Sequence, residues 1–331
     1  MNGSRPLVSI CLKSYNQREY LSPALEGVFA QTYRPLEIVI SDDHSTDGSW
    51  ELIGAYVGGD RVRALREEGV AVIANRNETN LGNVGNWERC CELAHGELLV
   101  KADGDDISLP ERTEVIAKAW EADGRRALAV CHSGWQIGPS GESYGRLRRV
   151  TASWPLGAAM AYSPRLYREF PSVPAAERRR MDDELYTRRA LMLGEVLELP
   201  DRLVRYRLGV GATSALRDIR SQVLFCNRDS LATIALSLSD LEHVKGTIGE
   251  SAYAEKLKWL KWNRDFLEAK IDQLTGATFA KRLAATRRIG FAHRVLSIAF
   301  YLELAFLMPR LLGDAMLRTY VVLRNFYWRH S

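Results

Sequence analysis

Short apolar segments alternate with helix-forming segments through the first part of the chain, and this alternation limits the fold more than any other feature. Apolar runs of strand length occupy residues 7–12, 36–40, 70–74, 97–101 and 128–131. Between these runs, apolar residues recur at three- and four-residue steps, for example over residues 21–29. Such steps are typical of amphipathic helices. The pattern predicts an α/β fold with a mostly parallel sheet flanked by helices.

Polar clusters follow the first, second and fourth predicted strands. They are Ser14-Tyr15-Asn16, Asp42-Asp43 with Ser45-Thr46-Asp47-Gly48, and Asp103-Gly104-Asp105-Asp106. In open α/β sheets, ligands bind in the crevice beyond the carboxyl ends of the strands. We therefore expect the three clusters to meet at one edge of the sheet and to form a binding site.

The acidic run at 103–106 indicates a cation. Asp103, Asp105 and Asp106 repel one another at neutral pH, and Mn²⁺ or Mg²⁺ held by one or two carboxylates together with substrate phosphates would relieve that repulsion. A cation there would neutralise charge on a leaving diphosphate. The alternative is that these aspartates cap the helix that Pro110 opens, or face water.

The other strand-end clusters also have structural alternatives, which spacing alone favours for most residues of the Asp42-Asp43 cluster. Asp42 or Asp43 would accept the imide N–H of a pyrimidine base, but Asp and Ser are also ordinary helix caps. Ser14, Tyr15 and Asn16 would present a hydroxyl and an aromatic face to a base, or form a turn. The same ambiguity applies to the last three polar candidates, which are Asn80, Gly82 and Asn86.

A second acidic cluster, Asp182-Asp183-Glu184, precedes the helical stretch 185–193. Acids near a helix start complement the helix dipole, which is the structural alternative. Adjacent carboxylates can also raise one pKa, and a carboxylate so tuned would suit a general base that deprotonates an acceptor hydroxyl.

Taken together and in order, the motifs resemble the family 2 glycosyltransferases, which have the GT-A fold. The resemblance covers roughly residues 6 to 214. It is carried by Val8-Ser9-Ile10 through Ser14-Tyr15-Asn16, Ala30-Gln31-Thr32-Tyr33, Ile38 through Gly48, Asn80-Leu81-Gly82, and Ala94-His95-Gly96-Glu97 leading to Asp106.

This resemblance implies an inverting transfer from a nucleoside-diphosphate sugar, with UDP-, dTDP- and GDP-sugars as candidate donors. Ser14, Tyr15 and Asp42 or Asp43 would hold the base, Asp103 and Asp105 would contact ribose or metal, and Asp106 would be the foremost metal ligand. Residues 154–158 look like the acceptor-side loop. Asp182-Asp183 resembles the acidic pair that carries the catalytic base. Spacing from Leu185 and Arg188 favours Asp182 as that base, whereas a simple reading of an acidic pair favours its second member, Asp183.

Two departures from the family pattern affect these expectations. Lys13-Ser14 stands where the family often has Pro-Thr, which places a lysine near the base pocket or the phosphates. The segment 206–211 lacks the His that many members use to bind metal or diphosphate, so Arg207 and backbone N–H groups of this Gly-rich segment are the candidates for charge neutralisation.

The rest of the chain is expected to be helical, which gives a catalytic domain at 1–214 and a helical C-terminal region at 215–331. Apolar residues at 253, 257, 260, 267, 271 and 274 predict an amphipathic helix. Although the net charge is only +4, residues 281–331 hold nine Lys or Arg against Glu303 and Asp314. The apolar stretch 295–308 between arginines is too short to span a bilayer and suits a helix at the membrane interface, with a buried helix or a homodimer contact as the alternative.

Composition narrows the remaining function classes. The five scattered cysteines lack CxxC spacing, which disfavours a zinc site or a disulfide framework and suits a reducing compartment. With no room for a signal peptide, we expect a cytoplasmic protein, peripheral on the inner face of the membrane if its tail binds lipid. No nucleic-acid-binding fold surrounds the basic tail.

The sequence thus predicts sugar transfer to a saccharide or lipid-linked acceptor. A nucleotidyltransferase lacks support because no Gly-rich basic loop follows the first strand, and a silent membrane-associated scaffold is the alternative from another class.

Overall fold

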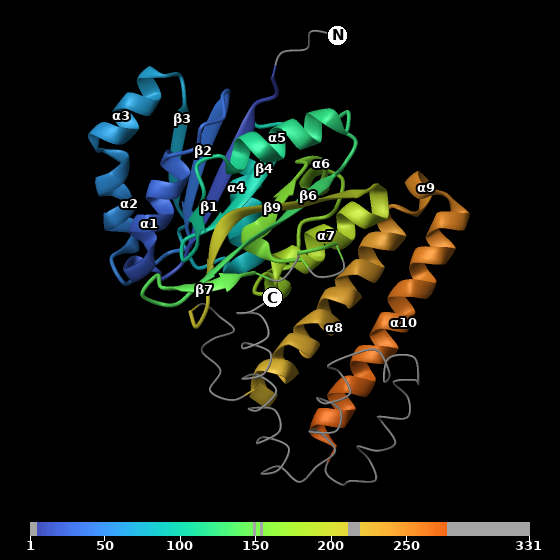
Figure 1. The fold of residues 1–331 in the computed structure, drawn as a ribbon. Coiled ribbons are helices and arrows are strands. Elements are labelled where there is room, and N and C mark those ends of the chain that lie inside the picture. The colour runs from blue at the N-terminus through green and yellow to red at the C-terminus, as the bar shows by residue number, and fades with distance from the viewer. Residues whose placement is uncertain (1–4, 148–149, 153–154, 211–218, 277–331) are drawn as a thin grey trace. The chain divides into compact units, whose positions relative to one another are not determined.

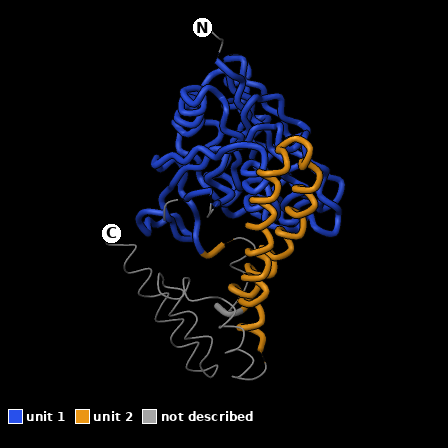
Figure 2. The backbone as a smooth tube through the Cα atoms, turned by 90° about the vertical axis from the view of Figure 1, so that its right-hand side faces the viewer, with its two compact units in different colours: residues 1–208 blue, residues 209–331 orange. Residues whose placement is uncertain are grey.

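A computed structural model describes residues 5–147, 150–152, 155–210 and 219–276 of the chain. The chain divides into two compact units, Met1–Leu208 and Gly209–Ser331 (Figure 2). This division lies six residues before the predicted boundary. Residues 281–331, and with them the predicted interfacial helix, lie outside the described residues.

Four parallel strands form the first half of the sheet in unit 1. β1 (Val8–Ser14) lies between β2 (Leu36–Asp42) and β4 (Leu98–Asp103), and β3 (Ala71–Arg76) pairs with β2 at the edge (Figure 1). All four were predicted from apolar runs. The register aligns Ser14 with Asp42 and Lys13 with Asp103, so these strands end at one level.

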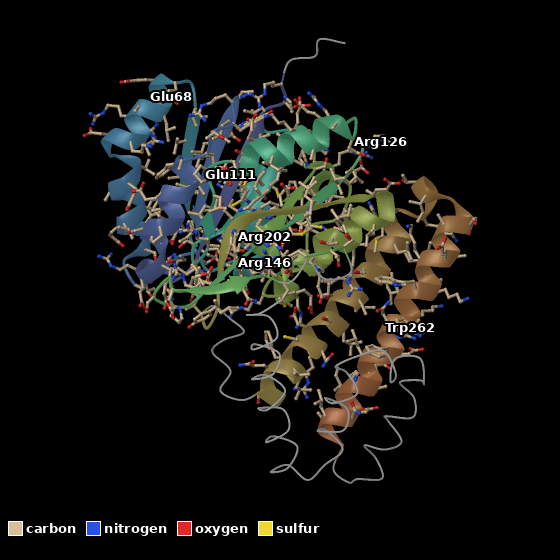
Figure 3. All side chains as sticks on the ribbon, viewed as in Figure 1. Glu68, Glu111, Arg126, Arg146, Arg202 and Trp262 are labelled. Atoms are coloured by element: carbon tan, nitrogen blue, oxygen red, sulfur yellow. The ribbon has the colours of Figure 1, made fainter. Side chains whose placement is uncertain are left out.

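The second half of the sheet is mixed. β8 (Met160–Tyr162) runs antiparallel between β4 and β6 (Ala129–Ile137), and β9 (Val196–Arg207) runs parallel to β6. Two short antiparallel strands complete the sheet, β5 (Ile107–Ser108) on β9 and β7 (Ser143–Arg146) on β6. Near its end, β6 presents Trp135, which pairs with Arg146 and lies under the guanidinium of Arg202 at 5.4 Å from the ring centroid. Figure 3 labels Arg146 and Arg202.

Helices cover both faces of the sheet because side chains alternate along each strand. Val8, Ile10 and Leu12 of β1 point into the main hydrophobic core, whereas Cys11 and Lys13 point to the opposite face, toward α4. The helices that supply the main core are α1 (Arg18–Phe29), α2 (Ser49–Val57), α3 (Asp60–Glu67) and α5 (Arg112–Ala122). The remaining helices of unit 1 are α4 (Gly82–Leu93), α6 (Arg165–Arg168) and α7 (Asp182–Leu193), with short 3-10 turns at Gly157–Ala159 and Ala175–Glu177.

Two helix starts differ from the sequence-based expectation. α5 begins at Arg112 with Glu111 as its N-cap, so Pro110 precedes the helix instead of lying in its first turn. The acidic cluster Asp182–Glu184 is itself the first turn of α7, where its charges face the positive end of the helix dipole.

Unit 2 is helical where it is described. α8 (Ile219–His243) and α10 (Glu250–Thr275) pack against each other and are joined through α9 (Lys245–Ile248). The predicted amphipathic helix corresponds to α10, which buries Leu260 and Ala269. Among the described helices, none is both long enough and apolar enough to cross a bilayer.

Truncating the centre of the sheet tests which strand the core depends on. Ile10 of β1 is fully buried, whereas Ile73 lies on the edge strand β3 and is only partly buried. We expect Ile10→Ala to lower the free energy of unfolding by about 2–5 kcal/mol, because a cavity remains in the core. Ile73→Ala, the matched control, should cost clearly less in the same urea titration. Equal losses would contradict the assignment of β1 as the central strand.

Candidate active site

The acidic run forms a tight turn directly after β4. Asp106 N–H donates to the Asp103 carbonyl at 3.1 Å, and Gly104 N–H donates to the Lys13 carbonyl of β1 at 2.9 Å. Position 104 packs closely against β1 and α1, because a Cβ there would lie 2.6 Å from Gln17 Oε1 and 3.2 Å from the Lys13 carbonyl oxygen. The turn therefore fixes three carboxylates against the carboxyl end of the neighbouring strand.

The three carboxylates of this turn differ in their electrostatic surroundings. Burial and the neighbouring Asp103 raise the pKa of Asp105 to about 6. Burial, followed by Asp105 and Asp103, raises the pKa of Asp106 well above its ordinary value. Burial also acts on Asp103, but Lys101 and Lys13 outweigh it and lower the pKa of Asp103 to about 2. Negative charge is thus compensated at Asp103 and uncompensated at Asp105 and Asp106.

Two lysines join the acidic turn to the first turn of α7. Lys13 Nζ lies 2.5 Å from Asp182 Oδ2 and 3.6 Å from Asp103 Oδ1. Lys101 Nζ lies 3.2 Å from Asp182 Oδ1 and 3.1 Å from Asp103 Oδ2. Burial lowers the pKa of Lys101, but Asp103, Asp182 and Asp183 together raise it well above its ordinary value. We call these four residues, Lys13, Lys101, Asp103 and Asp182, the lysine–aspartate ring.

Asp183, the neighbour of Asp182, is held by backbone groups instead. Its Oδ2 accepts the Gly157 N–H at 3.0 Å, and its Oδ1 accepts the Glu184 N–H at 2.9 Å. Burial and the adjacent Asp182 raise its pKa to about 7. Gly157 belongs to the predicted acceptor-side loop, and a Cβ at this position would lie 2.2 Å from Lys101 Nζ. The loop backbone therefore contacts both the acidic pair and the ring.

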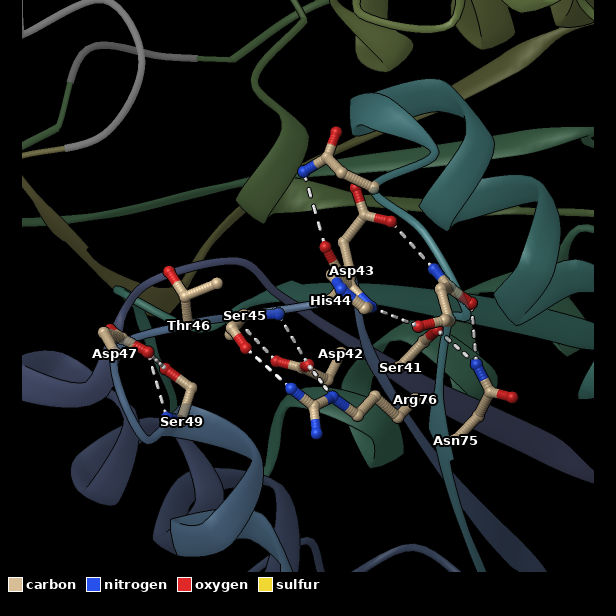
Figure 4. A network of polar contacts seen from close by, with 12 residues as sticks. Ser41, Asp42, Asp43, His44, Ser45, Thr46, Asp47, Ser49, Asn75 and Arg76 are labelled. Atoms are coloured by element: carbon tan, nitrogen blue, oxygen red, sulfur yellow. Dashed lines mark hydrogen bonds and ion pairs between the residues drawn. The ribbon is translucent and has the colours of Figure 1, made fainter.

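Asp42 and Asp43 are both engaged within the protein (Figure 4). The oxygens of Asp42 accept the Ser45 hydroxyl at 2.6 Å and the Ser45 N–H at 2.9 Å. Those of Asp43 accept the Leu81 N–H at 2.8 Å and the Gly82 N–H at 2.9 Å. Neither carboxylate caps α2, the helix that follows, whose N-cap is Gly48: Asp42 closes a turn with Ser45, and Asp43 binds N–H groups where α4 begins. The base-binding role of either carboxylate stays a prediction.

Residues after β1 line the same edge of the sheet. Ser14 Oγ is buried and has no hydrogen-bond partner in the described part of the chain. Tyr15 is 49% exposed. Asn16 adopts a positive φ of 50° and accepts the Thr46 N–H at 2.8 Å. Tyr15 is thus available to a ligand, whereas the Ser14 hydroxyl is closed off by the protein and Asn16 braces the loop after β2.

The residues around the start of α4 are mainly structural. Asn80 donates to the Asp43 carbonyl at 3.4 Å, and Asn86 donates to the Ser41 carbonyl at 3.1 Å. Gly82 has a φ of 83°, and a Cβ there would approach the Arg178 carbonyl to 2.8 Å. Their predicted contacts with the donor stay predictions.

Arg207, at the end of β9, braces the acidic turn. Its backbone N–H donates to Asp106 Oδ1 at 2.7 Å, and its Nε donates to the Asp105 carbonyl at 2.9 Å. Its Nη1 donates to the carbonyls of Gly138 and Pro139 at 3.1 and 2.7 Å. In this structure Arg207 therefore orients Asp105 and Asp106, and its predicted role toward a diphosphate remains to be tested.

Sequence reasoning missed Lys101, Asn83 and Arg112. Lys101 lies two residues before Asp103 on one strand, so side-chain alternation alone would place both on the same face. Asn83 accepts from Lys13 Nζ at 2.5 Å, and no sequence signal distinguishes it from its polar neighbours. Arg112 is fully buried and donates to the Lys101 carbonyl at 2.7 Å, which ties α5 to the backbone of β4.

Asp105 and Asp106 fit a cation that takes its other ligands from a substrate. Within the described ranges, no three His, Cys, Asp or Glu side chains converge as a complete metal site. Asp106 Oδ2, however, has no hydrogen-bond partner among the described residues, while Oδ1 is held by Arg207. Mg²⁺ and Mn²⁺ commonly bind through one or two carboxylates and substrate phosphates, which is the donor set offered here.

The raised pKa of Asp183 has a consequence for stability. An acid whose pKa rises on folding makes the folded state bind more protons than the unfolded state, so stability falls as pH increases between about 4 and 7. Asp183→Asn should remove this contribution. We expect wild type to lose stability relative to the variant over that window, by at most about 1.4 kcal/mol per pH unit, in urea titrations. Parallel stability curves for the two proteins would contradict the prediction.

Comparison with known proteins shows which family the chain resembles in sequence. The family model for glycosyl transferase family 2 matches residues 9–176, slightly more than half of the chain. Glycosyltransferase GlyG of Streptococcus pneumoniae is 33% identical over 111 residues, which cover 33% of this chain and 34% of GlyG. The uncharacterized glycosyltransferase MJ1057 of Methanocaldococcus jannaschii is 30% identical over 119 residues, which cover 35% of this chain and 38% of MJ1057. The chain thus spans about a third of the length of the curated relatives it matches.

Solved structures share the fold over nearly the whole chain. S. aureus TarS 1-349 in complex with UDP-GlcNAc has a TM-score of 0.58 at 15% identity, covering 95% of this chain and 90% of the TarS 1-349 chain. The mannosyltransferase PcManGT from Pyrobaculum calidifontis, in complex with GDP-Man and Mn²⁺, has a TM-score of 0.52 at 18% identity, covering 99% of this chain and 88% of PcManGT. The chain therefore belongs to glycosyl transferase family 2 and has the GT-A type fold that its motifs predict.

Proposed function

We propose that this protein transfers a sugar from a nucleoside-diphosphate sugar to a hydroxyl of a saccharide or lipid-linked acceptor, with inversion at the anomeric carbon. The observation that carries the proposal is the lysine–aspartate ring, in which Asp103 of the acidic turn and Asp182 of α7 contact the same two ammonium groups. A donor bound at the acidic turn would thus lie next to a carboxylate able to act on an acceptor.

The donor side of the proposal rests on the edge formed by β1, β2 and β4. Tyr15 would meet the base or ribose, since its aromatic ring is exposed there. Ser14 stays a predicted donor contact, with its hydroxyl buried and without a hydrogen-bond partner among the described residues. TarS and PcManGT are described with UDP-GlcNAc and GDP-Man, which supports UDP- and GDP-sugars as donor candidates. A dTDP-sugar stays among the candidates because it shares the diphosphate and the pyrimidine.

Asp105 and Asp106 would hold a divalent cation together with the donor diphosphate. When bound, the cation would neutralise charge that develops on the leaving diphosphate. Arg207 orients this pair through its backbone N–H and its guanidinium. PcManGT is described with Mn²⁺, which makes Mn²⁺ the first cation to test.

Asp182 is the proposed general base. Its contacts with Lys13 and Lys101 join it to Asp103 of the acidic turn, whereas Asp183, whose raised pKa would also suit a base, has both oxygens occupied by the N–H groups of Gly157 and Glu184. The acceptor oxygen would form its bond to the anomeric carbon as its proton passes to Asp182. The bond from that carbon to the phosphate oxygen would break, and its electron pair would leave with the nucleoside diphosphate.

A catalytically silent scaffold is the alternative, and it explains less. Such a protein has no need for a buried acidic pair that contacts the predicted acceptor-side loop and is joined through Lys101 to Asp103 of the acidic turn. A role in polysaccharide or glycolipid assembly, and attachment of residues 281–331 to a membrane surface, remain predictions. Vesicle flotation with and without that segment tests the second of them.

Donor binding tests the proposed function directly. We expect at least one UDP-, dTDP- or GDP-sugar to bind in calorimetry with Mn²⁺, and EDTA to weaken that binding. Asp106→Ala should weaken nucleotide binding by about 10-fold or more, because a charge-assisted interaction contributes about 1.5–3 kcal/mol. Lys118→Met, on the exposed face of α5, is the control and should bind normally. Absence of binding by every donor, or unchanged binding by Asp106→Ala, would contradict the proposal.

A further inference from the structure

Lys13 occupies a position at which the family often has proline, and its side chain is only 5% exposed. It lies on the face of β1 opposite the main hydrophobic core, one residue before the strand ends. Burying an ammonium group is costly unless it is paired and hydrogen-bonded. A lysine at this position is therefore stable only if acceptor groups of the fold pair with its ammonium group.

Those partners form two hydrogen bonds and one longer ion pair with the side chain. Lys13 Nζ lies 2.5 Å from Asp182 Oδ2, 2.5 Å from Asn83 Oδ1 and 3.6 Å from Asp103 Oδ1. An ammonium group has three N–H donors and no acceptor, so three acceptors surround it. The three acceptors come from α4, β4 and α7, which are distant in sequence.

Asp182 is held from two sides as a result. Its Oδ2 faces Lys13, and its Oδ1 faces Lys101 at 3.2 Å and Asn83 Nδ2 at 3.3 Å. With its neighbours fixed by the strands, the carboxylate has one orientation that satisfies both oxygens. The ring holds two positive and two negative charges, so it is balanced.

We propose that Lys13 is a positioning residue for the transfer reaction, which fixes the Asp182 carboxylate relative to Asp103 and thereby aligns the base with the donor site. The inference rests on the proposed function. Lys101 alone would leave Asp182 Oδ2 and Asn83 Oδ1 without their donor, and the carboxylate could rotate. Misplacing a reacting group by about 1 Å can cost about 100-fold in rate.

A double-mutant cycle on the full chain tests this role. Lys13→Met should lower kcat by about 10- to 100-fold and change the donor KM by less than about threefold, since the donor contacts remain. In an Asp182→Asn background, Lys13→Met should cause no further loss, because the residue acts through Asp182. Lys13→Arg, which keeps the charge, should recover part of the rate. Lys118→Met on α5 is the matched control, and its kcat should equal that of wild type.

Calorimetry gives the number of nucleotide sites per chain, and therefore the fraction of each variant that is folded. Each kcat is divided by that fraction. If Lys13→Met does not fold, Lys13→Gln takes its place in the cycle. Its neutral amide can still donate to Asp182 but carries no charge, so we expect a smaller loss of kcat that again disappears in the Asp182→Asn background. Full retention of kcat, or losses that multiply in the double variant, would overturn the positioning role and leave the proposed function standing. Absence of transfer in wild type and in the Lys118→Met control would defeat the proposed function, and the positioning role with it.

Discussion

The site depends on one electrostatic constraint, which is that buried carboxylates need counter-charges held by the fold. Asp103 and Asp182 come from elements far apart in sequence, and each would be unstable in a buried position alone. Lys13 and Lys101 contact both, so the two carboxylates are stable only when β1, β4 and α7 are in place together. The same four residues thus join the tertiary structure and the proposed chemistry.

The parallel register of the sheet brings the lysines into position. Lys13 is aligned with Asp103 across the β1–β4 pair, and Lys101 lies two residues earlier on β4. Both side chains therefore point to the face opposite the main core, where α4 and α7 supply Asn83 and Asp182. A one-residue shift in register would turn these side chains into the hydrophobic core.

Much of the fold could be predicted because its strands are apolar runs. β1, β2, β4 and the start of β6 are buried on both faces or nearly so, and the partly buried edge strand β3 is also an apolar run, which leaves a clear pattern in the sequence. β9 was missed because it contains Pro200, Asp201 and three arginines, and its strand form depends on pairing with β6. The acidic cluster at 182–184 was expected just before a helix but forms its first turn, since helix ends are set by capping that spacing resolves poorly.

The candidate site was predictable in its location but only partly in its contacts. The polar clusters after β1, β2 and β4 do meet at one edge, as strand-end geometry requires. Which carboxylates are free for a ligand depends on tertiary hydrogen bonds: Asp42 and Asp43 are occupied by Ser45 and by the start of α4, whereas Asp106 keeps one oxygen without a described partner. Lys101 went unnoticed because a lone lysine in a strand carries no motif.

The central claim is that Asp182, held by the lysine–aspartate ring, accepts the acceptor proton, and that its neighbour Asp183 does not. Steady-state transfer by Asp182→Asn and Asp183→Asn, with donor binding checked by calorimetry, compares the two most directly. The account predicts a loss of about 10²- to 10⁴-fold in kcat for Asp182→Asn, the size typical of a missing general base, with donor affinity retained. It predicts a markedly smaller loss for Asp183→Asn. The reverse order, with Asp182→Asn close to wild type, would contradict it.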